Sequence, residues 1–222
     1  MKLLNSTIGL KALMAVTGII LIGFVIIHML GNLQIFLPNT SDGAIPIDEY
    51  GKLLKSNAGV LWGARLTLLA SIGAHIYSAV ALTQRSRAAR PQNYESRKWM
   101  GSTYAVRTMR WGGVILILFV VYHLLHFTVG LENAAFSAHE YGKVKANVVS
   151  GFQKPLISIF YIVAQCALGL HLTHGVWSLF RTLGVSSPAW SDRAKQLAVL
   201  IGVVITVGNI SIPVSILLGL VK

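Results

Sequence analysis

Residues 111–130 read WGGVILILFVVYHLLHFTVG, an apolar stretch that contains no carboxylate and no lysine. Its length matches the ~20 apolar residues that an α-helix needs to cross a bilayer. Two histidines, His123 and His126, nevertheless lie in its second half. Because an imidazole inside hydrocarbon is costly, it is expected to face a partner, a cavity or a metal. The stretch therefore predicts a membrane span that carries a polar site.

The composition of the whole chain agrees with a membrane protein. Of its 222 residues, 54% are hydrophobic and only 12% are charged, whereas about 25% of the residues of a typical soluble domain are charged. Five apolar segments predict five transmembrane helices, at about residues 12–33, 60–83, 111–130, 155–180 and 194–220. No long polar segment remains for a soluble domain. Residues 1–222 are thus expected to form a single all-α transmembrane bundle.

The distribution of positive charge predicts the orientation of this bundle. Twelve of the 19 Lys and Arg residues, but only two of the seven acids, fall at the amino terminus and in the loops after the second and fourth spans. Because loops rich in Lys and Arg stay in the cytoplasm, we expect a cytoplasmic amino terminus. This asymmetry explains much of the net charge of +12. The basic loop at 85–110 is therefore not interpreted as a nucleic-acid site.

Four histidines lie past the midpoints of four successive spans: His28, His75, His123 and His171. Successive spans run in opposite directions, so at 1.5 Å per residue His28 and His123 fall about 3–8 Å outside the midplane and the other two about 5 Å inside it. Two ligands of one haem iron must lie at nearly equal depth. The spacing predicts the pairs His28–His123 and His75–His171, and with them two haems enclosed by the bundle. Two imidazoles on one iron favour electron transfer over oxygen chemistry.

Other features of the sequence leave alternatives open. A single membrane histidine is more often a hydrogen-bonded packing residue than a ligand, and only the matched depths of four favour ligation. His126 and His174 each follow a candidate ligand by three residues on nearly the same face, so spacing does not choose within either pair. The one cysteine, Cys166, excludes iron–sulfur ligation by several thiolates and a C-x-x-C-H haem attachment site.

Three arginines near span ends are candidate partners of haem propionates: Arg65, Arg110 and Arg181. The competing interpretation is that each side chain extends to the membrane interface. Small residues share a helical face with two of the histidines, namely Ser71, Ser78 and Ala79 with His75, and Ala164, Ala167 and Gly175 with His171. Such residues would let a flat macrocycle approach the backbone, but they are also ordinary packing residues between membrane helices.

Four segments together resemble a known family: IGFVIIHMLGN, AHIYSAVALTQRSR, FVVYHLLHF and LGLHLTHGVWSLFRTLGV. They are similar to the cytochrome b558 subunit of succinate dehydrogenases and fumarate reductases, in particular to the five-helix, two-haem anchor of menaquinone-linked bacterial enzymes. The resemblance covers nearly the whole chain. In that family the first histidine of each close pair is the ligand, which implies ligation of two b haems by His28, His75, His123 and His171.

The resemblance implies a role in respiratory complex II. The chain would anchor a flavoprotein subunit and an iron–sulfur subunit on the cytoplasmic face of a bacterial inner membrane. Electrons from succinate would reach menaquinone through the two haems, or take the reverse path for fumarate reduction. One position departs from the family: some two-haem fumarate reductases carry a glutamate of a transmembrane proton path where this chain has Gly169.

Two further predictions concern the surfaces of the bundle. Quinone is expected near the outer ends of the first three spans, where Asn32, Gln34 and His126 lie, and Asp48 and Glu49 could relay protons. The cytoplasmic basic rim is expected to contact the iron–sulfur subunit or the lipid around it; it includes Arg85, Arg87, Arg97 and Lys98.

Two other functions compete with this interpretation. A two-haem cytochrome could anchor another membrane dehydrogenase, such as a hydrogenase or a formate dehydrogenase. A haem-free transporter could use buried histidines as proton relays. Such a transporter is expected to combine broken helices with paired acids inside the membrane, and the sequence places none of its seven acids at mid-membrane.

Overall fold

The computed structural model of the protein describes residues 6–89, 104–130, 140–184 and 187–222, and these residues form helices, turns and loops but no strand. The long helices are α1 (Thr7–Asn32), α3 (Ala58–Ala88), α4 (Tyr104–His123), α6 (Pro155–Thr182) and α7 (Pro188–Leu217). The short elements are the 3-10 helix η1 (Leu33–Phe36), α2 (Pro46–Lys55), the π-helical turn η2 (Leu124–Val129) and α5 (Val144–Phe152).

Five helical segments of the described chain are long and apolar enough to cross a membrane, which confirms the predicted number of spans. They are Thr7–Phe36, Ala58–Ala88, Thr108–Val129, Pro155–Thr182 and Trp190–Leu217. Large apolar side chains are exposed along them, among them Phe24, Leu66, Leu118, Phe160 and Val203. Exposed apolar area of this extent is typical of a surface that meets lipid or a partner. The chain thus has the character of a multi-pass membrane protein.

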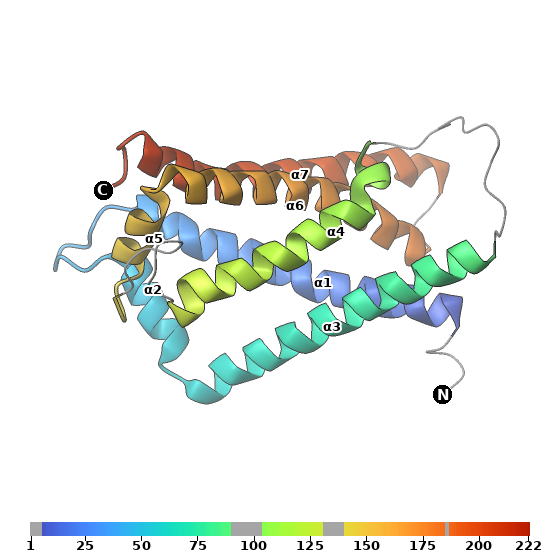
Figure 1. Ribbon diagram of the computed structural model, residues 1–222, viewed down its shortest axis with the longest axis horizontal. Coiled ribbons are helices and arrows are strands. Elements are labelled where there is room, and N and C mark those ends of the chain that lie inside the picture. The colour runs from blue at the N-terminus through green and yellow to red at the C-terminus, as the bar shows by residue number, and fades with distance from the viewer. Residues whose placement is uncertain (1–5, 90–103, 131–139, 185–186) are drawn as a thin grey trace.

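The long helices run along one axis of the molecule (Figure 1). The short helices α2 and α5 gather with the carboxyl terminus at one end, and the start of α1 lies at the other, which we call the amino-terminal end. We call the first of these the α2/α5 end. An odd number of spans places the two termini on opposite sides, as the five predicted spans require.

Local signals in the sequence fix where several helices begin. The Ser6 side chain accepts a hydrogen bond from the Gly9 amide at 2.9 Å and so caps α1, and Asn57 caps α3 through the Val60 amide at 3.1 Å. Helices α6 and α7 each have a proline in the first turn. Proline is tolerated there because the first amides of a helix have no partner within it. The long helices therefore have starts that local sequence defines.

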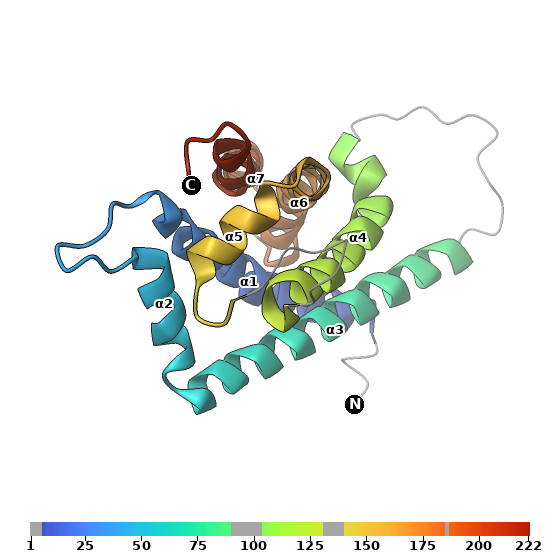
Figure 2. The ribbon, with the colours of Figure 1, turned by 60° about the vertical axis from the view of Figure 1, so that its left-hand side comes forward.

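The packing of the helices sets the order of the four that carry histidines. Helix α3 packs on α1, α1 contacts α6, and α6 packs on α4, while α7 packs against α6 and also contacts α1. The four histidine helices thus stand in the order α3, α1, α6, α4. Neither α1 with α4 nor α3 with α6 is among the closely packed pairs of the described residues. In both views of the bundle α6 and α7 lie side by side (Figures 1 and 2).

The contact between α6 and α7 depends on two glycines. A Cβ at Gly169 would collide with the Thr206 hydroxyl and lie 3.2 Å from the Gly202 carbonyl oxygen, and a Cβ at Gly202 would lie 2.8 Å from the Gly169 carbonyl oxygen. Small residues at this position let the two backbones approach closely, as is common between membrane helices. Position 169 therefore faces α7 and has no room for a side chain.

We predict that Gly169→Ala destabilises the protein by about 1–3 kcal/mol, the usual cost of inserting a methyl group into a filled interface. The measurement is thermal unfolding of the purified protein in detergent. Gly63→Ala is the matched control, because Gly63 is an exposed helical position on α3 where a Cβ would meet nothing within 4 Å. Equal stability of the two variants would contradict the close approach of α6 and α7.

The α2/α5 end is held together by contacts between distant parts of the chain. The Asp48 carboxylate on α2 accepts a hydrogen bond from the Lys145 amide in the first turn of α5 at 2.8 Å. A Cβ at Gly31 would collide with the Tyr50 ring, so that ring lies on the end of α1. Beneath these contacts lie buried side chains from η1, α2 and α5, including Ile35, Ile47 and Phe152. We refer to α2, α5 and these contacts as the end cap.

Candidate cofactor site

The ring of His28 on α1 faces the ring of His123 at the end of α4. Their centroids are 5.8 Å apart and their planes are nearly perpendicular, at 85°. Phe24 stacks on His28 at 5.2 Å, and Phe119 lies 5.7 Å from His123. This pair lies toward the α2/α5 end, and it is one of the two pairs that the depths of the histidines predict.

The second pair joins His75 on α3 to His171 on α6. The ring centroids are 6.3 Å apart and the planes are inclined at 56°. Nδ1 of His171 is buried and has no hydrogen-bond partner. An imidazole nitrogen in this condition is costly in a membrane interior. The depth argument predicts this pair as well, so the structure brings together all four candidate ligands in the expected combination.

Each pair joins helices that stand two places apart in the order α3, α1, α6, α4. The side chains therefore meet in the interior of the bundle, between backbones that do not pack closely on one another. His28 is eleven residues from Thr17, which touches His75, so the two pairs lie about 16 Å apart along α1 at 1.5 Å per residue. The result is two separate sites at two depths.

The separation of the rings fits one metal ion between two imidazoles. A metal–nitrogen bond of about 2.0 Å and a ring radius of about 1.15 Å place the centroids of two opposed ligands about 6.3 Å apart. The His75–His171 distance matches this value, and the His28–His123 distance is slightly shorter.

The donor set fits haem better than a bare metal ion. A protein-only site for zinc or a similar ion needs three or four ligands, and the described residues contain no group of three or more His, Cys, Asp or Glu that could hold one. Haem iron takes four nitrogens from its own macrocycle and requires only axial ligands from the protein. Two pairs of imidazoles, each between helices that do not pack closely on one another, are therefore compatible with two bis-histidine haem sites.

A π-helical turn separates His126 from His123. Helix α4 ends at His123, and the following turn is closed by the bond from the Gly130 amide to the Leu125 carbonyl at 3.1 Å. A π turn rotates less per residue than the 100° of an α-helix, so His126 is carried away from the face of His123. Its ring is only 2% exposed and stacks on Phe127 at 4.0 Å. The sequence spacing left this choice open, and the structure places His123 opposite His28.

Tyr161 on α6 joins the two histidines of this close pair. Its hydroxyl lies 3.1 Å from Nδ1 of His126 and 3.4 Å from Nδ1 of His123. A tyrosine hydroxyl can donate one hydrogen bond and accept another, so it can serve both rings at once. The ring of Tyr161 is 5% exposed and packs edge-on against Phe119 and Phe152. Sequence analysis did not single out this residue.

We predict that Tyr161→Phe lowers the stability of the protein by about 0.5–1.5 kcal/mol, because the ring packing is kept and the hydrogen bonding of the hydroxyl is lost. The measurement is thermal unfolding in detergent. Tyr77→Phe provides the control, since Tyr77 is 58% exposed on α3. A stability unchanged from that of the control would show that the hydroxyl contributes nothing.

The other candidate residues are not members of the two ring pairs. His174 packs edge-on against Trp177 at 6.2 Å, and its buried Nδ1 has no hydrogen-bond partner. Arg65 and Arg181 lie over the neighbouring rings of Trp62 and Trp177, at 5.0 and 5.2 Å. Arg110 is exposed. Contacts between these arginines and a cofactor stay a prediction.

The acids proposed as proton relays have other partners in the structure. Asp48 caps α5, as described above, and Glu49 pairs with Lys52 at 2.6 Å on an exposed surface. The hydrogen bond to Glu49 holds the pKa of Lys52 above its ordinary value. Asp48 thus joins α2 to α5, whereas the Glu49 pair lies within α2. A proton-relay role of either carboxylate stays a prediction.

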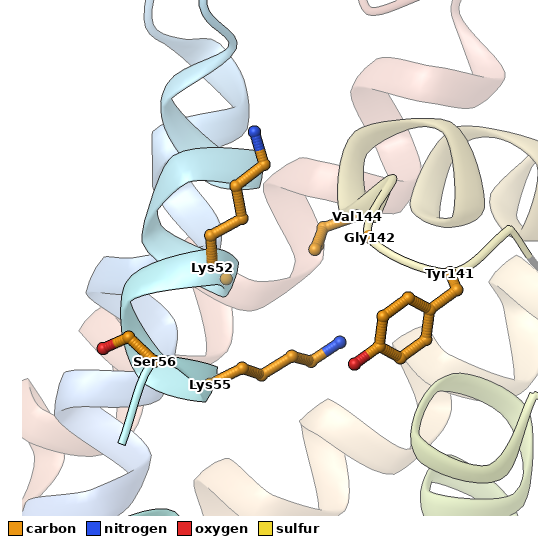
Figure 3. A pocket seen from close by; sticks show the side chains of 7 residues that line it. Lys52, Lys55, Ser56, Tyr141, Gly142 and Val144 are labelled. Carbon is orange, nitrogen blue, oxygen red and sulfur yellow. The ribbon is translucent and has the colours of Figure 1, made fainter. Parts of the chain in front are cut away.

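A shallow pocket lies between α2 and the turn before α5. Lys52, Lys55 and Ser56 line it on one side and Tyr141, Gly142 and Val144 on the other (Figure 3). Lys55 reaches across it to lie over the Tyr141 ring, 4.6 Å from its centroid. The pocket belongs to the end cap and contains none of the predicted ligands.

Comparisons of the chain with protein-family models, with curated proteins and with solved structures found no match.

Proposed function

We propose that the chain is the membrane-anchor cytochrome b subunit of a succinate:quinone oxidoreductase. The observation that carries the proposal is the arrangement of His28 with His123 and of His75 with His171. Each pair has a ring separation compatible with one iron. When bound, haem would supply one-electron transfer, because two axial imidazoles leave no iron position open for oxygen.

The histidines have distinct roles in this proposal. His28 and His123 hold the group nearer the α2/α5 end, and His75 and His171 hold the group nearer the amino-terminal end. His126 and His174 support the sites without ligation: His126 is turned toward Tyr161 and Phe127, and His174 toward Trp177. The chain thereby offers an electron a path between the two faces of the membrane.

The proposal includes partners and an orientation. The amino-terminal end would face the cytoplasm of a bacterium and bind an iron–sulfur subunit and a flavoprotein subunit, while menaquinone would react in the membrane. Arg85 and Arg87 are exposed in the last turn of α3, on that side. Arg97 and Lys98, the other members of the predicted basic rim, lie outside the described residues.

The packing of α6 bears on proton movement. Position 169, where some members of the resembled family carry a glutamate, is pressed against α7 and has no room for a side chain. The bundle therefore has no space at this position for a carboxylate side chain that could carry protons. Protons for quinone reduction would have to enter from the aqueous side at which quinone reacts.

We predict two b haems per chain. His28→Ala or His123→Ala should remove one haem, and His75→Ala or His171→Ala the other, because a haem that loses one of its two axial ligands is poorly retained. The measurement is haem content with a reduced-minus-oxidised absorption spectrum of the purified complex. His126→Ala and His174→Ala are the matched controls and should keep both haems. A chain with no haem, or haem that survives all four ligand substitutions, would overturn the proposal.

The identity of the associated subunits tests the rest of the proposal. Isolation of the chain from its own membranes in mild detergent should yield a flavoprotein and an iron–sulfur subunit, with succinate-dependent reduction of a menaquinone analogue. If hydrogenase or formate dehydrogenase subunits are recovered instead, the assignment as a cytochrome stands and the assignment of its partner subunits is wrong. That result would favour the alternative membrane dehydrogenases.

A further inference from the structure

Thr17 on α1 lies against the imidazole of His75 on α3. Its Oγ1 is 3.1 Å from Nδ1 of His75. Thr17 is only 5% exposed, and the next residue of α1 also faces the ring: a Cβ at Gly18 would lie 3.7 Å from Cε1 of His75. One edge of the imidazole is therefore fixed against α1.

The hydroxyl of Thr17 is within hydrogen-bond distance of two acceptors on its own helix. Oγ1 lies 2.8 Å from the carbonyl oxygen of Leu13 and 3.1 Å from that of Met14. Threonines in helices commonly donate to such carbonyls. With its one hydrogen given to the helix, the oxygen is left to accept from His75, and the hydrogen of the imidazole is then on Nδ1.

We infer that Thr17 is a positioning residue for the His75–His171 site: it accepts the Nδ1–H of His75 and thereby leaves Nε2 unprotonated and directed away from α1, as a metal ligand must be. The inference rests on the proposed function, because it concerns how the chain prepares a ligand for haem. Metal-ligating histidines generally donate their other ring N–H to a protein acceptor, which fixes the tautomer and raises the basicity of the ligand.

The position of Thr17 gives α1 a part in both sites. Thr17 and His28 are eleven residues apart, which is close to three full turns, so both lie on nearly the same face of the helix. One face of α1 therefore supplies a ligand to the His28–His123 site, which we call the outer site, and a hydrogen-bond acceptor to the His75–His171 site, which we call the inner site.

The test is a potentiometric titration of the b haems in the purified complex, comparing the unaltered chain with Thr17→Val and Thr17→Ser. The inner haem is assigned as the signal that His75→Ala removes. A hydrogen bond at Nδ1 strengthens the ligand and favours ferric iron. Thr17→Val should therefore shift the ferric–ferrous equilibrium of the inner haem about tenfold toward the ferrous form. For a one-electron couple this raises the midpoint potential of that haem by about 59 mV. Thr17→Ser should match the unaltered chain, and the outer haem should not change.

Thr67→Val is the matched control, since it makes the same chemical change at an exposed position of α3. Thr17→Ala covers the case in which valine does not fit. If Val and Ala both lose the inner haem while Ser keeps it, the hydroxyl is required and the inference stands. If either variant keeps the inner haem at an unchanged potential, or shifts both haems equally, the inference is wrong.

The failure of this inference differs from the failure of the proposed function. If the unaltered complex does not contain two b haems, the proposed function is wrong, and Thr17 then has no haem ligand to position. If both haems are present and their potentials are the same in Thr17→Val as in the unaltered chain, only the role of Thr17 is ruled out.

Discussion

An imidazole in the interior of a membrane is costly unless it has a polar partner, and Nδ1 of His171 and Nδ1 of His174 are buried without a hydrogen-bond partner. Four histidines meet in two pairs, each between helices that do not pack closely on one another. One buried apolar cluster extends from the end cap to Phe119 and Tyr161 beside His123, and a second lies where α1 meets α6 and α7. The histidine pairs thus lie next to apolar packing between the helices.

Much of this arrangement could be predicted from the sequence. Apolar runs of sufficient length defined the five spans, and the alternation of their directions predicted which histidines share a depth. This worked because a rise of 1.5 Å per residue and a fixed membrane thickness convert sequence position into depth. The partners of His28 and His75 follow from that conversion, without knowledge of how the helices pack.

Features that depend on rotation and on neighbouring helices could not be predicted in this way. The π turn after His123 changes the face of His126, and its signal is a backbone bond rather than a residue type. Thr17 and Tyr161 are unremarkable polar residues of apolar spans until the packing of α1 on α3 and of α4 on α6 brings them to histidines. Gly169 is one of many glycines in the sequence, and only the structure shows that it is the contact of α6 with α7.

The bond between Asp48 and the Lys145 amide has a consequence for the order of folding. It joins residues 97 apart in the chain, and closing a loop of that length costs about 4 kcal/mol in chain entropy. A hydrogen bond to a charged group contributes only about 1.5–3 kcal/mol. The bond cannot form by itself, and it becomes favourable only after association of the intervening spans α3 and α4 has brought its two ends together. The end cap is therefore a late step in assembly, and its closure marks a bundle in which the two spans between its ends, α3 and α4, are already in place.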